Sequence, residues 1–171
     1  MFQKGDYVIY GTRGVCCVQD VGTLDISGIS KDKLYYTLIP CYTNGSTVYS
    51  PVDSNRIVIR PVMSHDEAME LIRSIPEIEE LWIRDERNRE NTYRDVIKSC
   101  DNVELVRIIK TIYNRGQLRI AAGKKATVSD EKYFRIAEEN LYGELAISLN
   151  VSRDEVRGLI VEKIQELVPS V

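Results

Sequence analysis

Glutamate is absent from residues 1–63 of the chain and abundant after them. The glutamate-free part is rich in valine, isoleucine, tyrosine and threonine, which favour β-strands, whereas glutamate favours helices. We therefore predict an α+β fold in which an all-β part precedes an all-α part, with the boundary near Pro61. The 171 residues suffice for two small domains, which we expect to span residues 1–62 and 63–171.

The first part contains five short stretches with the composition and alternation of β-strands: 6–10, 15–21, 34–39, 46–50 and 56–59. The Asn44-Gly45 pair lies between the third and fourth stretches and predicts a tight hairpin turn, because both residues tolerate positive φ angles. Five short strands predict a small, bent antiparallel barrel of the Tudor or SH3-like kind. A barrel of this size seldom closes completely, so we expect one strand edge to stay open.

The second part carries three capping-box patterns, in which a helix-capping side chain precedes a glutamate by three residues: Ser64 with Glu67, Asp101 with Glu104, and Ser152 with Glu155. Pro76 predicts the start of a further helix, because proline is tolerated in the first helical turn. Another helix is predicted over residues 129–149, where apolar residues recur at helical spacing: Phe134, Ala137, Leu141 and Leu145. These signals predict a compact domain of about five helices.

Signatures of enzymes and metal sites are missing from the sequence. The four cysteines show no CxxC spacing and the only histidine is His65, so we expect no metal site, no disulfide framework and no cofactor. Glycine-rich phosphate-binding loops and the GxSxG and HExxH motifs are also absent from the sequence. We predict that the protein is not an enzyme.

The sequence also argues against a membrane segment and a secretion signal. The longest charge-free stretch, residues 34–52, is interrupted by the polar residues 43–47 and therefore indicates a hairpin rather than a membrane span. Lys4 and Asp6 precede any apolar run, which argues against a signal peptide. We expect a cytoplasmic protein that does not contact membranes.

Charge is unevenly distributed along the helical part. Residues 103–125 carry six basic residues and one acidic residue, and the basic ones include Arg115, Arg119 and Lys124. The sequence after residue 127 carries more acidic than basic residues, and the formal net charge of the chain is −3. Two interpretations remain open, a surface for a polyanion such as DNA, or a basic helix that packs beside an acidic one.

The only tryptophan, Trp82, begins a stretch that is rich in arginine: Arg84, Arg87, Arg89 and Arg94. Helical spacing would place Arg84, Arg87 and Arg94 on one helix face, with Trp82 near its end. A ring flanked by guanidinium groups suits stacking on exposed bases while the arginines bind phosphates. Two alternatives remain: Trp82 is a core residue between Leu81 and Ile83, which its residue type favours, and the arginines pair with Asp85, Glu86, Glu90 and Asp95.

Several motifs occur in an order that resembles the CarD/CdnL family of bacterial transcription regulators over nearly the whole chain: Lys4-Gly5-Asp6-Tyr7-Val8-Ile9-Tyr10, Gly14-Val15, Thr47-Val48-Tyr49-Ser50-Pro51, the tryptophan and arginine stretch, and Leu141-Tyr142-Gly143-Glu144-Leu145-Ala146. The resemblance implies a Tudor-like N-terminal domain, shared with transcription-repair coupling factor, that binds the β subunit of RNA polymerase by strand addition. It implies an interface formed by Ile39, Thr47, Tyr49 and Pro51.

The resemblance further implies that the helical domain contacts promoter DNA at the upstream edge of the transcription bubble. Trp82 matches the family's inserting tryptophan, so the resemblance favours an exposed role for this ring and makes the nearby arginines candidate phosphate contacts. The stretch that follows Trp82 is about four residues longer than the family pattern, which on a helix adds about one turn. We expect a regulator that acts as a monomer, stabilises the open complex and reads little sequence; the alternative is a protein-interaction adaptor on RNA polymerase that does not bind DNA.

Overall fold

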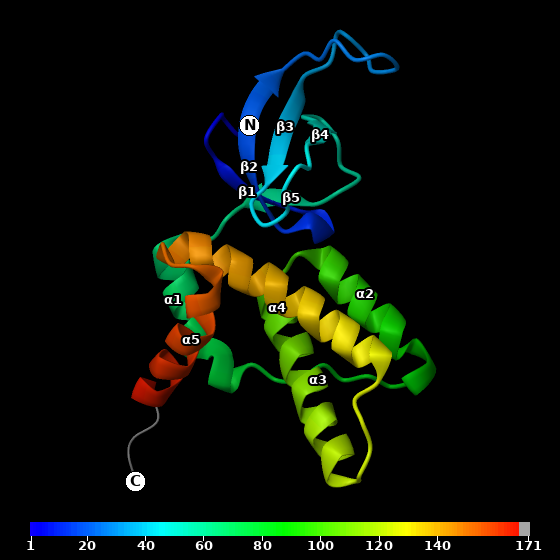
Figure 1. Cartoon of the computed structure of the whole chain (residues 1–171), viewed down its shortest axis with the longest axis vertical. Coiled ribbons are helices and arrows are strands. Elements are labelled where there is room, and N and C mark those ends of the chain that lie inside the picture. The colour runs from blue at the N-terminus through cyan, green and yellow to red at the C-terminus, as the bar shows by residue number, and fades with distance from the viewer. Residues whose placement is uncertain (168–171) are drawn as a thin grey trace. The chain divides into compact units, whose positions relative to one another are not determined.

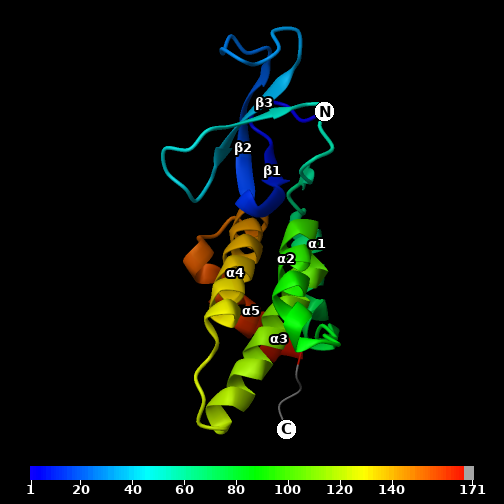
Figure 2. The same ribbon diagram turned by 90° about the vertical axis from the view of Figure 1, so that its right-hand side faces the viewer.

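A computed structural model describes residues 1–167, with side chains as far as residue 162. The chain divides into two compact units, Met1–Val62 and Met63–Val171. The first unit is a five-stranded antiparallel sheet and the second is built from helices (Figures 1 and 2). The predicted α+β fold, with strands first and helices after them, is therefore confirmed.

The strands of the first unit are β1 (Tyr7–Tyr10), β2 (Val15–Gly22), β3 (Tyr35–Pro40), β4 (Val48–Pro51) and β5 (Ile59–Pro61). They pair in the order β4-β3-β2-β1-β5, so β4 and β5 are the edge strands. Alternating side chains form a small core on one face of the sheet: Val8, Tyr10, Cys16, Val18, Tyr36 and Leu38. Their spacing by two residues is the pattern expected of strands with one buried face.

Two local predictions in this unit are wrong. The connection between β3 and β4 spans residues 41–47, and of Asn44 and Gly45 only the glycine has a positive φ, +75°. A loop of this length can reverse the chain without the tight turn that Asn44-Gly45 favours. The last strand is Ile59–Pro61 rather than 56–59. Pro61 lies opposite Val8. The strand can include this proline because β5 is an edge strand, where proline is tolerated.

The α-helices in the described part of the second unit are α1 (His65–Ser74), α2 (Arg89–Ser99), α3 (Asn102–Ala121), α4 (Val128–Leu149) and α5 (Arg153–Leu167). Ser64 and Glu67 form the predicted reciprocal capping box at α1. Asp101 caps α3 by accepting from the backbone N–H groups of Val103 and Glu104, while the Glu104 side chain binds Arg107 instead. The Glu155 carboxylate accepts from the Ser152 N–H before α5.

The helix predicted from Pro76 does not form. Pro76 lies in a single 3-10 turn, Ile75–Glu77, and the backbone at Ile78 is extended. A second 3-10 turn, Glu86–Asn88, leads into α2, which begins at Arg89. The stretch 78–85 between these turns contains Trp82 and is not helical. A lengthening of four residues after Trp82, as the resemblance implies, would therefore not rotate this ring about a helix axis.

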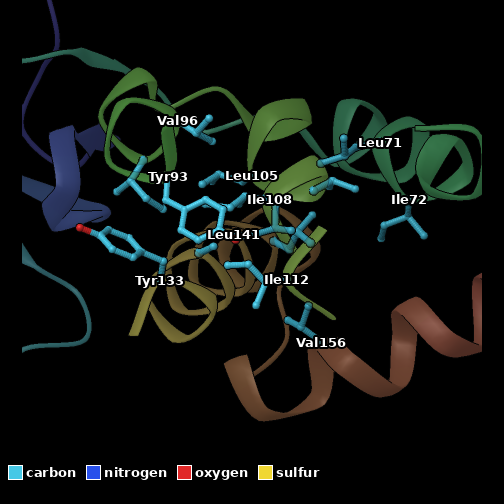
Figure 3. Close-up of a cluster of buried hydrophobic side chains, with 14 of the residues drawn as sticks. Leu71, Ile72, Tyr93, Val96, Leu105, Ile108, Ile112, Tyr133, Leu141 and Val156 are labelled. Carbon is cyan, nitrogen blue, oxygen red and sulfur yellow. The ribbon is translucent and has the colours of Figure 1, made fainter. Parts of the chain in front are cut away.

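The core of the helical unit is formed mainly by α1–α4, with α5 covering one side. Figure 3 shows Leu105, Ile108 and Ile112 of α3 between side chains of the neighbouring helices. The predicted apolar stripe of α4 is buried at Ala137, Leu141 and Leu145, and Phe134 packs partly buried against the same core. None of the helices in residues 1–167 is long and apolar enough to cross a membrane.

Candidate functional site

The residues expected to bind RNA polymerase lie on and beside the edge strand β4. In the pairing of β3 with β4, Thr37 lies opposite Tyr49 and Tyr35 lies opposite Pro51. Alternation places Ile39, Tyr49 and Pro51 on the face of the sheet opposite its core, and Thr47 immediately precedes β4. The Tyr49 ring is 43% exposed and Ile39 is half-buried.

Tyr49 also directs its backbone polar groups to the open side of β4. The Val52 N–H donates to the Leu34 carbonyl at 3.0 Å, and Val52 follows the strand in the same register. Hydrogen-bonded and non-bonded pairs alternate in an antiparallel ladder, so Val48 and Ser50 bond to β3 whereas the Tyr49 N–H and C=O face outward. Pro51 has no N–H, which limits the open edge to the residues around Tyr49.

Trp82 lies on residues 78–85, a segment without helix or strand that connects the 3-10 turns Ile75–Glu77 and Glu86–Asn88 and has extended backbone at Ile78 and Asp85. Leu81 and Ile83 are partly buried against that core, whereas Trp82 between them is 80% exposed. Alternation with a period of two residues is the reason, because an extended chain directs neighbouring side chains to opposite sides. Trp82 is therefore not a core residue. The expectation that Arg84, Arg87 and Arg94 share one helix face, with Trp82 near its end, is wrong, because residues 78–85 are not helical.

Side chains of α3 hold this segment by binding its backbone. Lys110 donates its Nζ to the Ile78 carbonyl at 2.7 Å, and Arg107 donates to the carbonyls of Glu79 and Glu80 at 3.2 and 3.4 Å. The Leu81 N–H donates to Thr111 Oγ1 at 2.9 Å. Burial lowers the pKa of Lys110. Part of the positive charge of α3 is thus used to bind an irregular strand within the unit.

The segment ends at Glu86, which accepts from two arginines. Arg89 at the start of α2 donates Nε to Glu86 Oε2 at 2.9 Å, and Arg115 of α3 donates to the same oxygen at 2.7 Å. These hydrogen bonds, that of Arg89 first, lower the pKa of Glu86 to about 2. Glu86 therefore stays ionised well below neutral pH and fixes the turn before α2.

The two arginines belong to a closed ring of polar side chains, which we call the polar ring: Glu86, Arg89, Tyr93, Arg115 and Asp130. The Arg115 guanidinium lies 2.9 Å from Asp130 Oδ2. The Tyr93 hydroxyl donates to Asp130 Oδ1 at 3.1 Å and accepts from Arg89 at 3.0 Å. Asp130 is only 2% exposed. Burial raises the pKa of Tyr93, and its ring packs against Tyr133 at a centroid distance of 5.7 Å (Figure 3).

The predicted DNA-binding cations therefore fall into two groups. Arg89, Arg115 and Arg119 are half-buried and bind protein atoms, Arg119 through the Lys125 carbonyl at 2.8 Å. The exposed cations are Arg84, Arg87, Arg94 and Lys124. Arg94 contacts Glu90 and Asn91; the side chains of the other three make no hydrogen bond or ion pair within residues 1–162.

Sequence reasoning missed two features of these surfaces. Tyr7 and Cys17 lie in one row with Ile39 across β1, β2 and β3 and extend the face that carries Tyr49; the alternation of β1 could have indicated Tyr7. Leu118, Ile120 and Val128 are exposed at the end of α3 and the start of α4, near Lys124. The helical periodicity of residues 102–121 could have identified Leu118 as lying off the buried face.

No group of three or more histidine, cysteine, aspartate and glutamate side chains in the described part of the chain could hold a metal ion. The four cysteines are free thiols. Burial raises the pKa of Cys16 to about 12, so this thiol is protonated at neutral pH.

The comparison with known protein families identifies the first unit. Residues 2–63 match the sequence model of the CarD-like/TRCF RID domain, where RID denotes the RNA polymerase interaction domain. The match supports an interaction of this unit with RNA polymerase. The N-terminal unit is thus similar in sequence to the CarD-like/TRCF RID domain, and the match covers residues 2–63 of the 171. No curated protein matches the chain.

Proposed function

We propose that the two units divide the work, with residues 1–62 binding the β subunit of RNA polymerase and residues 63–171 contacting promoter DNA. The RID match supports the first half of this proposal. The edge position of β4 supports strand addition, because the outward N–H and C=O of Tyr49 can pair with a strand of the β subunit. The side chains of Ile39, Thr47, Tyr49 and Pro51 then contact the added strand and its neighbours.

The exposure of Trp82 is the observation that carries the second half of the proposal. A tryptophan that is 80% exposed on a firmly held segment is available to stack on a base without rearrangement of the unit. We propose that it stacks at the upstream edge of the transcription bubble, where melted DNA exposes bases. Stacking on a single base contributes about 1–3 kcal/mol. Because this contact exists only with melted DNA, it stabilises the open complex relative to the closed one.

The exposed cations Arg84, Arg87, Arg94 and Lys124 are the proposed phosphate contacts. Phosphate contacts position a protein on DNA but read no sequence, so promoter choice remains with the polymerase. Arg89, Arg115 and Arg119 act differently in this proposal, since they hold the segment and the loops that carry the contacting residues. The protein works without a cofactor, as a monomer on the polymerase in the cytoplasm, and is not a catalyst.

One observation favours the alternative, an adaptor on RNA polymerase that does not bind DNA. Arg107, Lys110 and Arg115 of the basic helix α3 all bind protein groups, so the positive charge of that helix does not by itself indicate a DNA surface. Binding to a fork-junction DNA, measured at several salt concentrations, distinguishes the two functions. The adaptor shows no salt-dependent affinity for this DNA.

The decisive experiment compares the wild type with Trp82→Ala on a promoter complex formed with RNA polymerase. We expect a shorter open-complex half-life, by about fivefold or more if 1 kcal/mol of stacking is lost. Binding of the variant to an isolated β-subunit fragment remains at the wild-type level. Trp82→Phe retains part of the effect because a smaller ring still stacks. An unchanged half-life with Trp82→Ala would refute the stacking role.

A further inference from the structure

An apolar groove of about 1100 Å³ lies in the helical unit, and none of the exposed cations named above lines it. The stretch 76–80 forms one of its walls, and α3, α4 and α5 form the others. Neither the proposed strand addition nor the proposed DNA contact uses it. Its volume is slightly above the range of small-molecule pockets, about 300–1000 Å³, and it is open to solvent. The size suits several side chains of a macromolecule better than one enclosed ligand.

Apolar and aromatic side chains line the groove: Ile109 and Tyr113 of α3, Phe134 and Tyr142 of α4, and Ile160 and Val161 of α5. Tyr113 is 57% exposed and Val161 is 49% exposed. Phe134 and Tyr142 are eight residues apart on α4, which corresponds to about 12 Å along the helix. The groove is therefore long enough for about two turns of a helix laid along it.

Acidic side chains surround this apolar lining. Glu77, Glu79, Glu80 and Glu138 line the groove, against only two cations, Lys110 and Arg157. Both cations are engaged, Lys110 with the Ile78 carbonyl at 2.7 Å and Arg157 with Glu138 at 2.8 Å. The Glu77 and Glu79 carboxylates are exposed and, within residues 1–162, make no hydrogen bond or ion pair. The rim thus carries uncompensated negative charge, which repels nucleic acid.

We propose that the groove binds a protein segment that forms a short amphipathic helix, with an apolar ridge flanked by lysine or arginine. The apolar ridge covers Tyr113 and Val161, and the basic flanks pair with Glu77 and Glu79. This mode of recognition is that of a helix in a groove, read by apolar residues at spacings of three and four. The charge of the rim determines that the partner is basic, since an acidic helix would be repelled by the unpaired carboxylates of Glu77 and Glu79.

The test uses the full-length protein and a labelled synthetic 14-residue peptide with leucines at helical spacing and flanking lysines. We expect saturable binding in fluorescence anisotropy, and at least tenfold weaker binding of a control peptide in which glutamates replace the lysines. Val161→Glu weakens binding at least tenfold. Glu77→Lys combined with Glu79→Lys weakens it about fivefold or more and reduces its salt dependence. Asp95→Lys, a single charge reversal at an exposed position of α2, leaves the affinity unchanged.

All of these variants replace exposed residues, so we expect them to fold. If Val161→Glu nevertheless unfolds the unit, the Glu77→Lys, Glu79→Lys variant still tests the groove. The proposal would be overturned if the Glu77→Lys, Glu79→Lys variant bound the peptide as tightly as the wild type does. It would also be overturned if Asp95→Lys weakened binding as much, because attraction would then be non-specific. Sedimentation velocity without peptide tests for self-association of the protein. If the wild type self-associates and the Glu77→Lys, Glu79→Lys variant does not, a second copy of the chain occupies the groove and the proposed partner is wrong.

Discussion

Arg89 and Arg115, from helices α2 and α3, donate to the same carboxylate oxygen of Glu86. The same guanidinium groups also contact the buried, hydrogen-bonded pair of Tyr93 and Asp130. Arg89 donates to the Tyr93 hydroxyl, and Arg115 lies against Asp130. The polar ring closed by these contacts joins α2, α3 and α4 at the point where the Trp82 segment ends. Arg89 and Arg115, both candidate DNA contacts from the sequence, therefore fix the position of the segment that carries Trp82.

The first prediction concerns Glu86 and pH. The pKa of Glu86 is about 2 in the folded protein and near 4.5 when unperturbed. A lowered pKa stabilises the fold above the unfolded value, and this contribution is lost as pH falls from about 5 to about 2. Because the Glu86 side chain is 67% exposed, we expect Glu86→Gln to lower the free energy of unfolding by at most about 1 kcal/mol at pH 7. Urea unfolding at pH 7 and pH 3 measures this difference, which shrinks at the lower pH.

Glu70→Gln on α1 is the control for this prediction. Glu70 also pairs with an arginine three residues away, but both side chains are largely exposed and the pair is isolated. We expect its replacement to change the free energy of unfolding little. A Glu86→Gln variant with the same stability difference at pH 3 as at pH 7 would contradict the role of the ionised carboxylate.

The second prediction separates the backbone of Tyr49 from its ring. Tyr49→Pro removes an outward N–H and leaves the ladder with β3 intact, because proline is tolerated on an edge strand. We expect it to abolish binding to a β-subunit fragment in a pull-down while the thermal unfolding of the protein changes little. Tyr49→Ala keeps the N–H and weakens binding only in part. Val48→Pro is the matched control, since it removes an N–H that points to β3 and should destabilise the sheet itself.

The third prediction concerns the two groups of cations. Replacing Arg84, Arg87 and Lys124 by alanine should reduce the log–log salt slope of fork-junction DNA binding by roughly one unit per lost phosphate contact, with nearly unchanged stability. Arg115→Ala should act in the opposite way, because it leaves Asp130 buried without its cation, at a cost on the order of 3 kcal/mol. DNA titrations at several salt concentrations and urea unfolding distinguish the groups. A triple variant with the wild-type slope would remove these residues from the interface.

Much of the fold follows from local sequence signals. Ser64 and Glu67 form the capping box that their spacing predicts, and the helix predicted over residues 129–149 is α4. These signals are reliable because the interacting groups lie within a few residues of one another.

The sequence did not reveal the conformation of residues 78–85, because that conformation depends on distant groups. Leu81 is fixed by Thr111, thirty residues further along, and Ile78 by Lys110. Local helical spacing of the arginines suggested a continuous helix, whereas bonds from α3 to the backbone stabilise an extended chain there. For the same reason the sequence could not separate Arg89 and Arg115, which bind Glu86, from the exposed Arg84 and Arg87.

The last prediction compares Trp82 with its neighbour Ile83. Because the two side chains differ in exposure, we expect their replacement by alanine to have different effects on the free energy of unfolding. Trp82 is 80% exposed, so Trp82→Ala should change the free energy of unfolding by no more than about 0.5 kcal/mol. Ile83 is partly buried against the core, so Ile83→Ala should cost about 1–2 kcal/mol, less than a fully buried isoleucine. Thermal and urea unfolding of the two variants measure these values. A large loss of stability with Trp82→Ala would mean that the ring is packed in solution, and the proposed stacking on DNA would then lack its exposed side chain.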